Sequence, residues 1–258
     1  MLRTQGLRAV LAMLYLAASA SAVAAAESAS AWTVDQLAAK NAEARGGLER
    51  LHALKAVRSK GKLLVNSGAL ELGFAEMRQR PAAVRDEVSL QGLTQVNATD
   101  GTQAWQISPF QGRKDPEKMS ADDAKALNEG SEIDGPLIDY RLKGSVVEYL
   151  GTEDVDGTAA HKLQVTRKDG IVQTVFLDPE HFLEIRLLSR RIEHGVEVVT
   201  QTDYGEYQAV DGIYFPFAIA SGAKGSASPA QTQLESVEVN PKLDTAIFAM
   251  PASAAPTK

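Results

Sequence analysis

The sequence reads MRQRP at residues 77–81 and TDGTQAWQISPF at residues 99–110, and these two stretches decide the fold. Apolar and polar residues alternate around them, which is typical of β-strands with one buried face. The alternation stops after Phe110, and residues 111–143 are rich in Lys, Asp, Glu and Ala. We therefore expect an antiparallel sheet interrupted by a polar, helix-prone segment that covers it, an arrangement that favours a binding protein over an enzyme.

The N-terminus has the features of a signal peptide. Arg3 and Arg8 precede a short apolar run, and an alanine-rich cleavage site ends at Ala26. The apolar run is shorter than the roughly 20 residues that a membrane-spanning helix needs. We predict that residues 1–26 are removed on export to the periplasm; cleavage after Ala22 and a retained membrane anchor are the alternatives.

Composition restricts the function further. Removal of the two N-terminal arginines changes the formal net charge from −6 to −8. An acidic chain without clustered Lys and Arg argues against binding to nucleic acid and to anionic lipid surfaces. The chain has no cysteine, so its stability must come from a packed core rather than from disulfides. We expect one domain, residues 27–251, followed by a disordered tail at 252–258.

A helix is predicted at the start of this domain. Thr33 and Gln36 have the spacing of a capping box, which satisfies free backbone N–H groups at a helix N-terminus. Apolar residues then recur at helical spacing as far as Leu51. Gly46-Gly47 lies inside this pattern, and glycine there favours a break in the helix.

Alternation with a period of two follows from Lys55 onward and predicts strands with one apolar face. Dipeptides that favour tight hairpin turns separate these strands. The alternating stretches include residues 70–74, 84–90, 162–166, 183–187 and 236–239. The turn dipeptides are Asp100-Gly101, Asp156-Gly157, Asp169-Gly170, His194-Gly195 and Asp211-Gly212. This order predicts a mainly β protein of the α+β type, in which a curved antiparallel sheet forms an incomplete β-barrel with an N-terminal helix.

One segment interrupts the succession of strands. A helix start is predicted at Ser120, and Asp134-Gly135-Pro136 is a stop signal. A short apolar cluster then follows at residues 137–142. We interpret residues 111–143 as containing two short helices placed between the two halves of the sheet.

Catalytic and metal-binding patterns are weak in this sequence. The paired carboxylates Asp122-Asp123 and Glu153-Asp154 are adjacent in sequence, which favours solvated surface over a converging acid–base pair. The four histidines do not have the spacing of metal ligands; they are His52, His161, His181 and His194. We therefore predict no enzyme activity, no metal and no cofactor. An exported hydrolase is the least favoured alternative.

Arg80 is the most informative polar residue. It precedes Pro81, which cannot donate to a sheet ladder, so the position is a strand end or an edge. An exposed arginine is one interpretation; an arginine at the mouth of a cavity, holding helix carbonyls or a ligand anion, is the other. Trp105, Ile107 and Phe110 allow a similar choice between core and cavity lining.

The same residues carry a family resemblance. RQRP at 78–81 and TDGTQAWQISPF at 99–110 resemble the "K-R-P … S-D-G-x-x-x-W-x-x-x-P-F" pattern of the periplasmic lipoprotein carrier LolA. LDTAIFAMP at 243–251 is similar to that family's closing "D-x-x-x-F-x-x-x-P". RGGL at 45–48 and VDGIYFP at 210–216 look more like the wider group of outer-membrane lipoprotein-sorting-like proteins. Together these motifs span essentially the whole mature chain.

The resemblance implies an incomplete barrel with a helical lid, residues 113–142, over an apolar cavity for acyl chains. It also implies that the Arg80 side chain holds the lid closed through hydrogen bonds to the backbone of the lid. The segment between Phe110 and Leu137 is more charged than an apolar lid would be. The candidate ligand-binding and latch residues are Leu70, Leu72, Phe74, Arg80, Val88, Leu90, Trp105, Ile107, Phe110, Leu137 and Ile138.

On this basis we expect a periplasmic carrier of lipid acyl chains or lipoproteins. Its partners would be lipids or lipoproteins and membrane-bound donor and acceptor proteins, with no nucleic acid, and it would be a monomer. The alternative is a non-catalytic envelope sensor or interaction module with the same fold.

Overall fold

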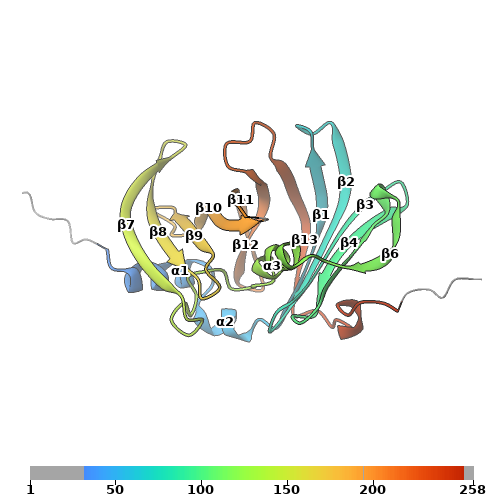
Figure 1. Ribbon diagram of the computed structural model, residues 1–258. Helices are drawn as coiled ribbons and strands as arrows, with labels where there is room; N and C mark the ends of the chain where they lie inside the picture. Colours follow the sequence, from blue (N-terminus) through green and yellow to red (C-terminus); the bar gives the residue numbers. More distant parts are fainter. Residues whose placement is uncertain (1–31, 194, 253–258) are drawn as a thin grey trace, which may run out of the picture. The chain divides into compact units, whose positions relative to one another are not determined.

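A single antiparallel sheet of 13 strands dominates the computed structural model, which describes residues 32–193 and 195–252 (Figure 1). The strand order is β6-β5-β4-β3-β2-β1-β13-β12-β11-β10-β9-β8-β7. The predicted signal peptide, residues 253–258 of the predicted tail, and His194 lie outside the described residues.

The strands follow the predicted alternation. Their bounds are β1 Ala56–Val65, β2 Leu70–Gln79, β3 Ala83–Leu90, β4 Leu93–Thr99, β5 Ala104–Ser108, β6 Arg113–Lys118, β7 Val146–Val155, β8 Thr158–Thr166, β9 Val172–Leu177, β10 Glu184–Glu193, β11 Val196–Val210, β12 Ile213–Ala223 and β13 Ala230–Val239. At the turns, Asp156 and Asp211 have positive φ, as does the glycine that follows each of them. These values suit the tight hairpins that the Asp-Gly dipeptides predict.

Two meanders, β1–β6 and β7–β13, are joined by the pairing of β1 with β13. In the register, Val57 lies opposite Val239 and Leu64 opposite Gln231. The edge strands β6 and β7 do not pair with each other, so the curved sheet stays open. The predicted mainly β fold, with an incomplete barrel, is confirmed.

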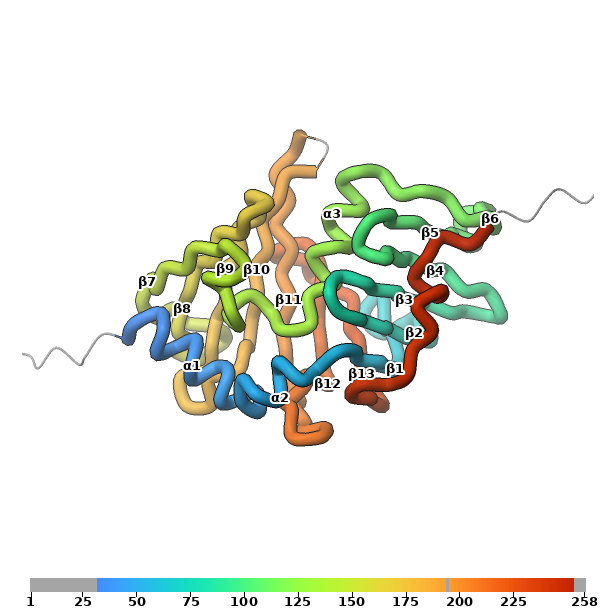
Figure 2. Tube along the Cα trace, turned by 90° about the horizontal axis from the view of Figure 1, so that it is seen from below, coloured from blue at the N-terminus to red at the C-terminus, as the bar shows by residue number. Residues whose placement is uncertain are grey.

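The N-terminal helix is divided at the glycine pair, as predicted. Helix α1 spans Val34–Ala44 and begins with the Thr33–Gln36 capping box, and helix α2 spans Leu48–Ala53. Both helices lie along one side of the sheet when it is seen from below (Figure 2). Within the part of the chain that the structure describes, no helix is long and apolar enough to cross a membrane.

The chain must pass from edge strand β6 to the opposite edge strand β7, and this crossing forms the cover. Helix α3, Ala121–Gly130, begins at Ser120, whose side chain caps it as the sequence predicts. The prediction of a second helix over 137–142 is wrong, because residues 131–145, all of them described, form turns that pack as a connector. Leu137 and Ile138 hold this connector through buried apolar contacts with α1, α2 and the sheet. We call residues 131–145 the connector.

The C-terminal segment covers the outer face of β3–β5 (Figure 2). It contains the short 3-10 helix η2, Thr245–Ile247, and a second 3-10 helix, η1, Pro109–Gln111, joins β5 to β6. Trp105 is fully buried there, and its indole Nε1 donates to the carbonyl of Phe248 over 2.8 Å. Arg85 donates to the carbonyl of Ile247 over 2.9 Å.

Candidate functional site

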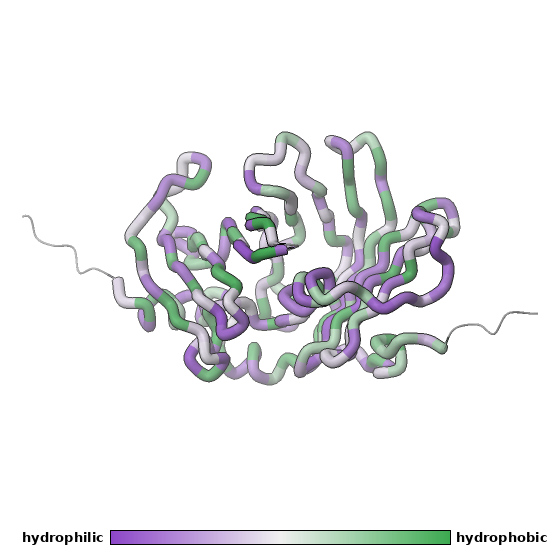
Figure 3. Tube along the Cα trace, in the orientation of Figure 1, coloured by the Kyte–Doolittle hydropathy of each residue, from purple (hydrophilic) through white to green (hydrophobic). Residues whose placement is uncertain are grey.

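A cavity of about 550 Å³ lies on the concave face of the sheet, beneath α3 and the connector. Strands of both meanders form its walls. Its apolar lining residues include Val57, Phe74, Val175, Leu187, Phe215, Ile219 and Leu234. Its polar lining residues include Ser59, Glu76, Arg78, Glu129, Gln173, Ser189, Arg191, Thr200, Thr202, Ser221 and Thr232. The lining is therefore mixed, and polar and apolar segments also alternate along the surrounding strands (Figure 3).

The strand register explains this mixture. Phe74, Glu76 and Arg78 have the same parity in β2, so they point to the same face of the sheet. Glu76 lies opposite Asp86 of β3, which puts a third ionisable side chain on that face. Burial, with the Glu76 charge nearby, raises the pKa of Asp86 to about 7, although Arg78 acts in the opposite direction.

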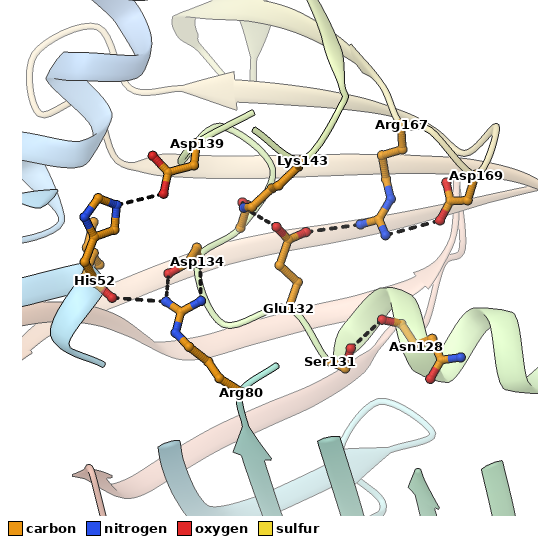
Figure 4. A network of polar contacts seen from close by, with 12 residues as sticks. His52, Arg80, Asn128, Ser131, Glu132, Asp134, Asp139, Lys143, Arg167 and Asp169 are labelled. Atoms are coloured by element: carbon orange, nitrogen blue, oxygen red, sulfur yellow. Dashed lines mark hydrogen bonds and ion pairs between the residues drawn. The ribbon is translucent and has the colours of Figure 1, made fainter. Parts of the chain in front are cut away.

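Arg80 joins β2, α2 and the connector (Figure 4). Its Nε donates to the carbonyl of Leu54 over 2.6 Å, and its Nη2 donates to the carbonyl of Leu51 over 3.1 Å. Its Nη1 donates to Asp134 over 2.7 Å, and Nη2 pairs with the other carboxylate oxygen. The hydrogen bonds to Asp134 raise the pKa of Arg80 above its usual value, although burial acts in the opposite direction. Arg80 thus binds the connector through a side chain, and binds backbone carbonyls only at the end of α2.

Further cations hold the connector at both sides of Asp134. Arg45 donates to the carbonyl of Asp134, and its Nη1 lies 3.7 Å from Glu184. Glu132 pairs with Lys143 and, over 3.1 Å, with Arg167 (Figure 4). The connector is therefore fixed by several ion pairs between residues that are distant in sequence.

Helix α3 is attached to β9 and β10 by Glu129, and to the turn before β9 by Lys125, whose Nζ donates to the carbonyl of Asp169 over 3.2 Å. Glu129 accepts hydrogen bonds from Gln173, over 2.9 Å, and from Ser189. Arg191 lies 3.6 Å from the same carboxylate. No residue of α3 is fully buried, and these polar contacts fix its C-terminal end against β9 and β10.

The predicted site residues fall into different places. Phe74 lines the cavity, and Arg80 lies at the cover as described above. Leu72, Val88 and Leu90 share the face of Phe74 but lie nearer the hairpin turns, where Leu70 is 36% exposed.

The other predicted residues lie outside the cavity. Leu137 and Ile138 are buried in the core, where they also border a smaller hollow of about 440 Å³ beside α1. Trp105 and Ile107 pack with Val96 and Ala98 against Met250 on the outer face of the sheet. Phe110 is 41% exposed in η1.

Substitution of Trp105 tests its structural role. We expect Trp105→Phe to lower the free energy of unfolding by about 1–2 kcal/mol, because the buried carbonyl of Phe248 loses its donor. Affinity for any cavity ligand should not change, because Trp105 lies on the outer face. Urea unfolding and a ligand titration of the same variant check both statements; a large loss of affinity at unchanged stability would contradict this placement.

Sequence reasoning missed the charged residues of the cavity. The same period of two that placed Leu70, Leu72 and Phe74 on one face also places Glu76 and Arg78 there, and this signal was present in the sequence. The contribution of Glu129 depends on where α3 crosses the sheet, which local sequence does not reveal. Among the described residues, no group of three or more His, Asp or Glu side chains is arranged to hold a metal ion.

Comparison with known proteins gives structural matches only. No protein-family model and no curated protein sequence matches the chain. A structure of a protein domain from Vibrio parahaemolyticus, described as outer membrane lipoprotein-sorting, is 12% identical with a TM-score of 0.51, over 82% of this chain and 97% of that chain. A DUF1329 family protein from Desulfovibrio piger is 13% identical with a TM-score of 0.58, over 84% and 97%.

A third solved structure belongs to the LolA superfamily. This protein, from Nitrosomonas europaea, is 13% identical with a TM-score of 0.54, and the match covers 85% of this chain and 98% of that chain. At these identities the similarity is one of fold. The open sheet, the covering helix and these matches together show that the chain has the fold of the wider LolA-like, lipoprotein-sorting group.

Proposed function

We propose that this protein is a non-catalytic periplasmic carrier that holds lipid or lipoprotein acyl chains beneath α3. The observation that carries the proposal is the cavity of about 550 Å³ beneath a cover that hydrogen bonds and ion pairs hold in place. This volume is within the range of small-molecule sites, about 300–1,000 Å³. Each methylene buried against the apolar lining residues would contribute about 0.8 kcal/mol to binding.

The cover supplies a route for loading and release. Helix α3 has no buried residue, and Glu129 attaches it to the wall through hydrogen bonds. Hydrogen bonds to a charged group contribute about 1.5–3 kcal/mol each, and local opening at such a cost populates a minor open state. The helix can therefore open while the connector, which is fixed by Arg80 and Arg45, stays in place.

A substitution that fills the cavity tests the proposal. Thr232 lines the cavity, and the next residue in β13, Gln233, is exposed on the other face. We expect Thr232→Trp to weaken binding of a fluorescent fatty-acid probe at least about tenfold, because the indole occupies the volume of the ligand. Gln233→Trp is the matched control and should leave the affinity within about twofold.

Native mass spectrometry of the gently purified mature protein is the complementary measurement. A bound lipid or acylated peptide is expected. A clean apo mass together with no binding of the probe by the wild type would refute the carrier function, and equal affinities of the two Trp variants would refute the cavity as its site.

A further inference from the structure

We propose that the cargo is an amphiphile with a net-neutral polar headgroup, bound inside the cavity at Glu76 and Arg78 with its apolar chain directed toward the hairpins of β1–β4. This inference rests on the proposed carrier function and adds the class and orientation of the ligand. The volume of the cavity does not by itself decide between a charged and a neutral ligand. The arrangement of charges around it does.

The charges that line the cavity are paired. Three arginines and four glutamates contribute to the lining. Each arginine has a glutamate partner, and the remaining carboxylate, Glu132, pairs with Arg167 and Lys143. The lining pairs are Arg45 with Glu184, Arg78 with Glu76, and Arg191 with Glu129. A ligand with a net charge would therefore be buried without a free counter-charge, which is costly in a low-dielectric site.

The pair of Glu76 and Arg78 offers both a donor and an acceptor to the cavity. Nη2 of Arg78 donates to Oε1 of Glu76 over 2.7 Å. Nη1 of Arg78 and Oε2 of Glu76 have no hydrogen bond to another described residue, and the two side chains are 30% and 19% exposed. A headgroup that donates and accepts, through an ammonium and a phosphate or through hydroxyls, matches both atoms.

The protein does not satisfy this cluster by itself. Nε of Arg78 and Oδ1 of Asp86 are buried without a partner among the described residues. Burial raises the pKa of Asp86 to about 7, so this carboxyl does not add a full negative charge near neutral pH. Unsatisfied buried polar atoms are rare in folded proteins and call for an external partner such as water or a ligand.

Polarity changes along the strands, which gives the direction of the ligand. On the face of Glu76 and Arg78, the residues toward the hairpin turns are apolar: Leu72 lies opposite Leu63, and Phe74 lies opposite Val88. The opposite end is closed by Arg80 and α2. The headgroup therefore lies at the level of Glu76, and the chain extends from Phe74 of the cavity lining toward Leu72 and Leu63 nearer the rim.

Two lysolipids with the same palmitoyl chain separate the possibilities. We expect palmitoyl-lysophosphatidylethanolamine, which is zwitterionic, to displace the fluorescent fatty-acid probe at a concentration at least about tenfold lower than anionic palmitoyl-lysophosphatidylglycerol. Equal displacement, or stronger displacement by the anionic lipid, would overturn the headgroup inference while leaving the carrier function intact. No probe binding and no lysolipid binding would overturn both.

Variants that neutralise one charge at a time test whether the headgroup preference arises at Glu76 and Arg78. Glu76→Gln removes the hydrogen-bonded counter-charge of Arg78 and leaves only the Asp86 carboxyl nearby, so it should shift the preference toward the anionic lysolipid. Arg78→Gln has the opposite effect and should retain or increase the discrimination against it. Unchanged preference in both variants would show that the headgroup does not bind here; if either variant fails to fold, the wild-type comparison of the two lysolipids still decides the ligand class.

Discussion

Substitution Arg80→Leu is expected to lower the free energy of unfolding by about 2–4 kcal/mol and to speed ligand exchange. The Asp134 side chain is only 5% exposed, and it would lose its main counter-charge. The carbonyls of Leu51 and Leu54 would also lose a donor. The Arg80 side chain itself is 34% exposed, so water screens part of its interaction with Asp134. The expected loss of stability therefore stays below the upper end of the range measured for buried ion pairs.

Two further variants test whether Arg80 specifically holds the connector in place, or whether the loss of any charged side chain has the same effect. Arg58 pairs with Glu238 across neighbouring strands, and the Glu238 side chain is 48% exposed. Arg58→Leu therefore leaves a solvated carboxylate rather than a buried one, and it should change stability by less than about 1 kcal/mol. The double variant Arg80→Leu with Asp134→Leu removes the unpaired buried carboxylate and should be more stable than Arg80→Leu alone. Hydrogen exchange of residues 131–136 should rise selectively in Arg80→Leu; unchanged exchange there and unchanged ligand exchange would rule out the latch.

Substitution Asp86→Asn is expected to raise the free energy of unfolding at pH 8 by about 2–4 kcal/mol. Burial raises the pKa of Asp86 in the folded state from 3.8 to about 7. Between these values the folded protein holds more protons than the unfolded chain, so the contribution of Asp86 to stability is complete below pH 4 and is lost as the pH rises through 7. Asparagine stays neutral at every pH and avoids this loss.

The measurement is urea unfolding of the wild type and the variant at pH 4, 6 and 8. The stability difference should be small at pH 4 and should grow steadily with pH. Asp115→Asn, at an exposed position of β6, is the control and should show no such trend. A difference that is independent of pH would mean that Asp86 is ionised normally in the folded protein.

Much of the fold is predictable because the sequence signals that specify it act between residues that are neighbours in the chain. The capping box at Thr33, the break at Gly46-Gly47 and the Asp-Gly turns act over two to four residues, and the structure contains all of them. The second lid helix was not predictable in this way. The apolar cluster at 137–142 reads as a helical face, but Leu137 and Ile138 are buried in two different core clusters, which an irregular backbone allows.

Local sequence is sufficient to predict strands with two chemically different faces, and to place Arg80 at the end of one strand. Which of these faces enclose the cavity depends on the tertiary structure. Trp105 and Ile107 have the pattern of lining residues, yet β5 presents them to the outer face, where Met250 covers them. Periodicity separates the two faces of a strand but does not say which becomes concave, because that depends on long-range pairing such as β1 with β13. The contact between Arg80 and Asp134, 54 positions apart, depends on the same closure.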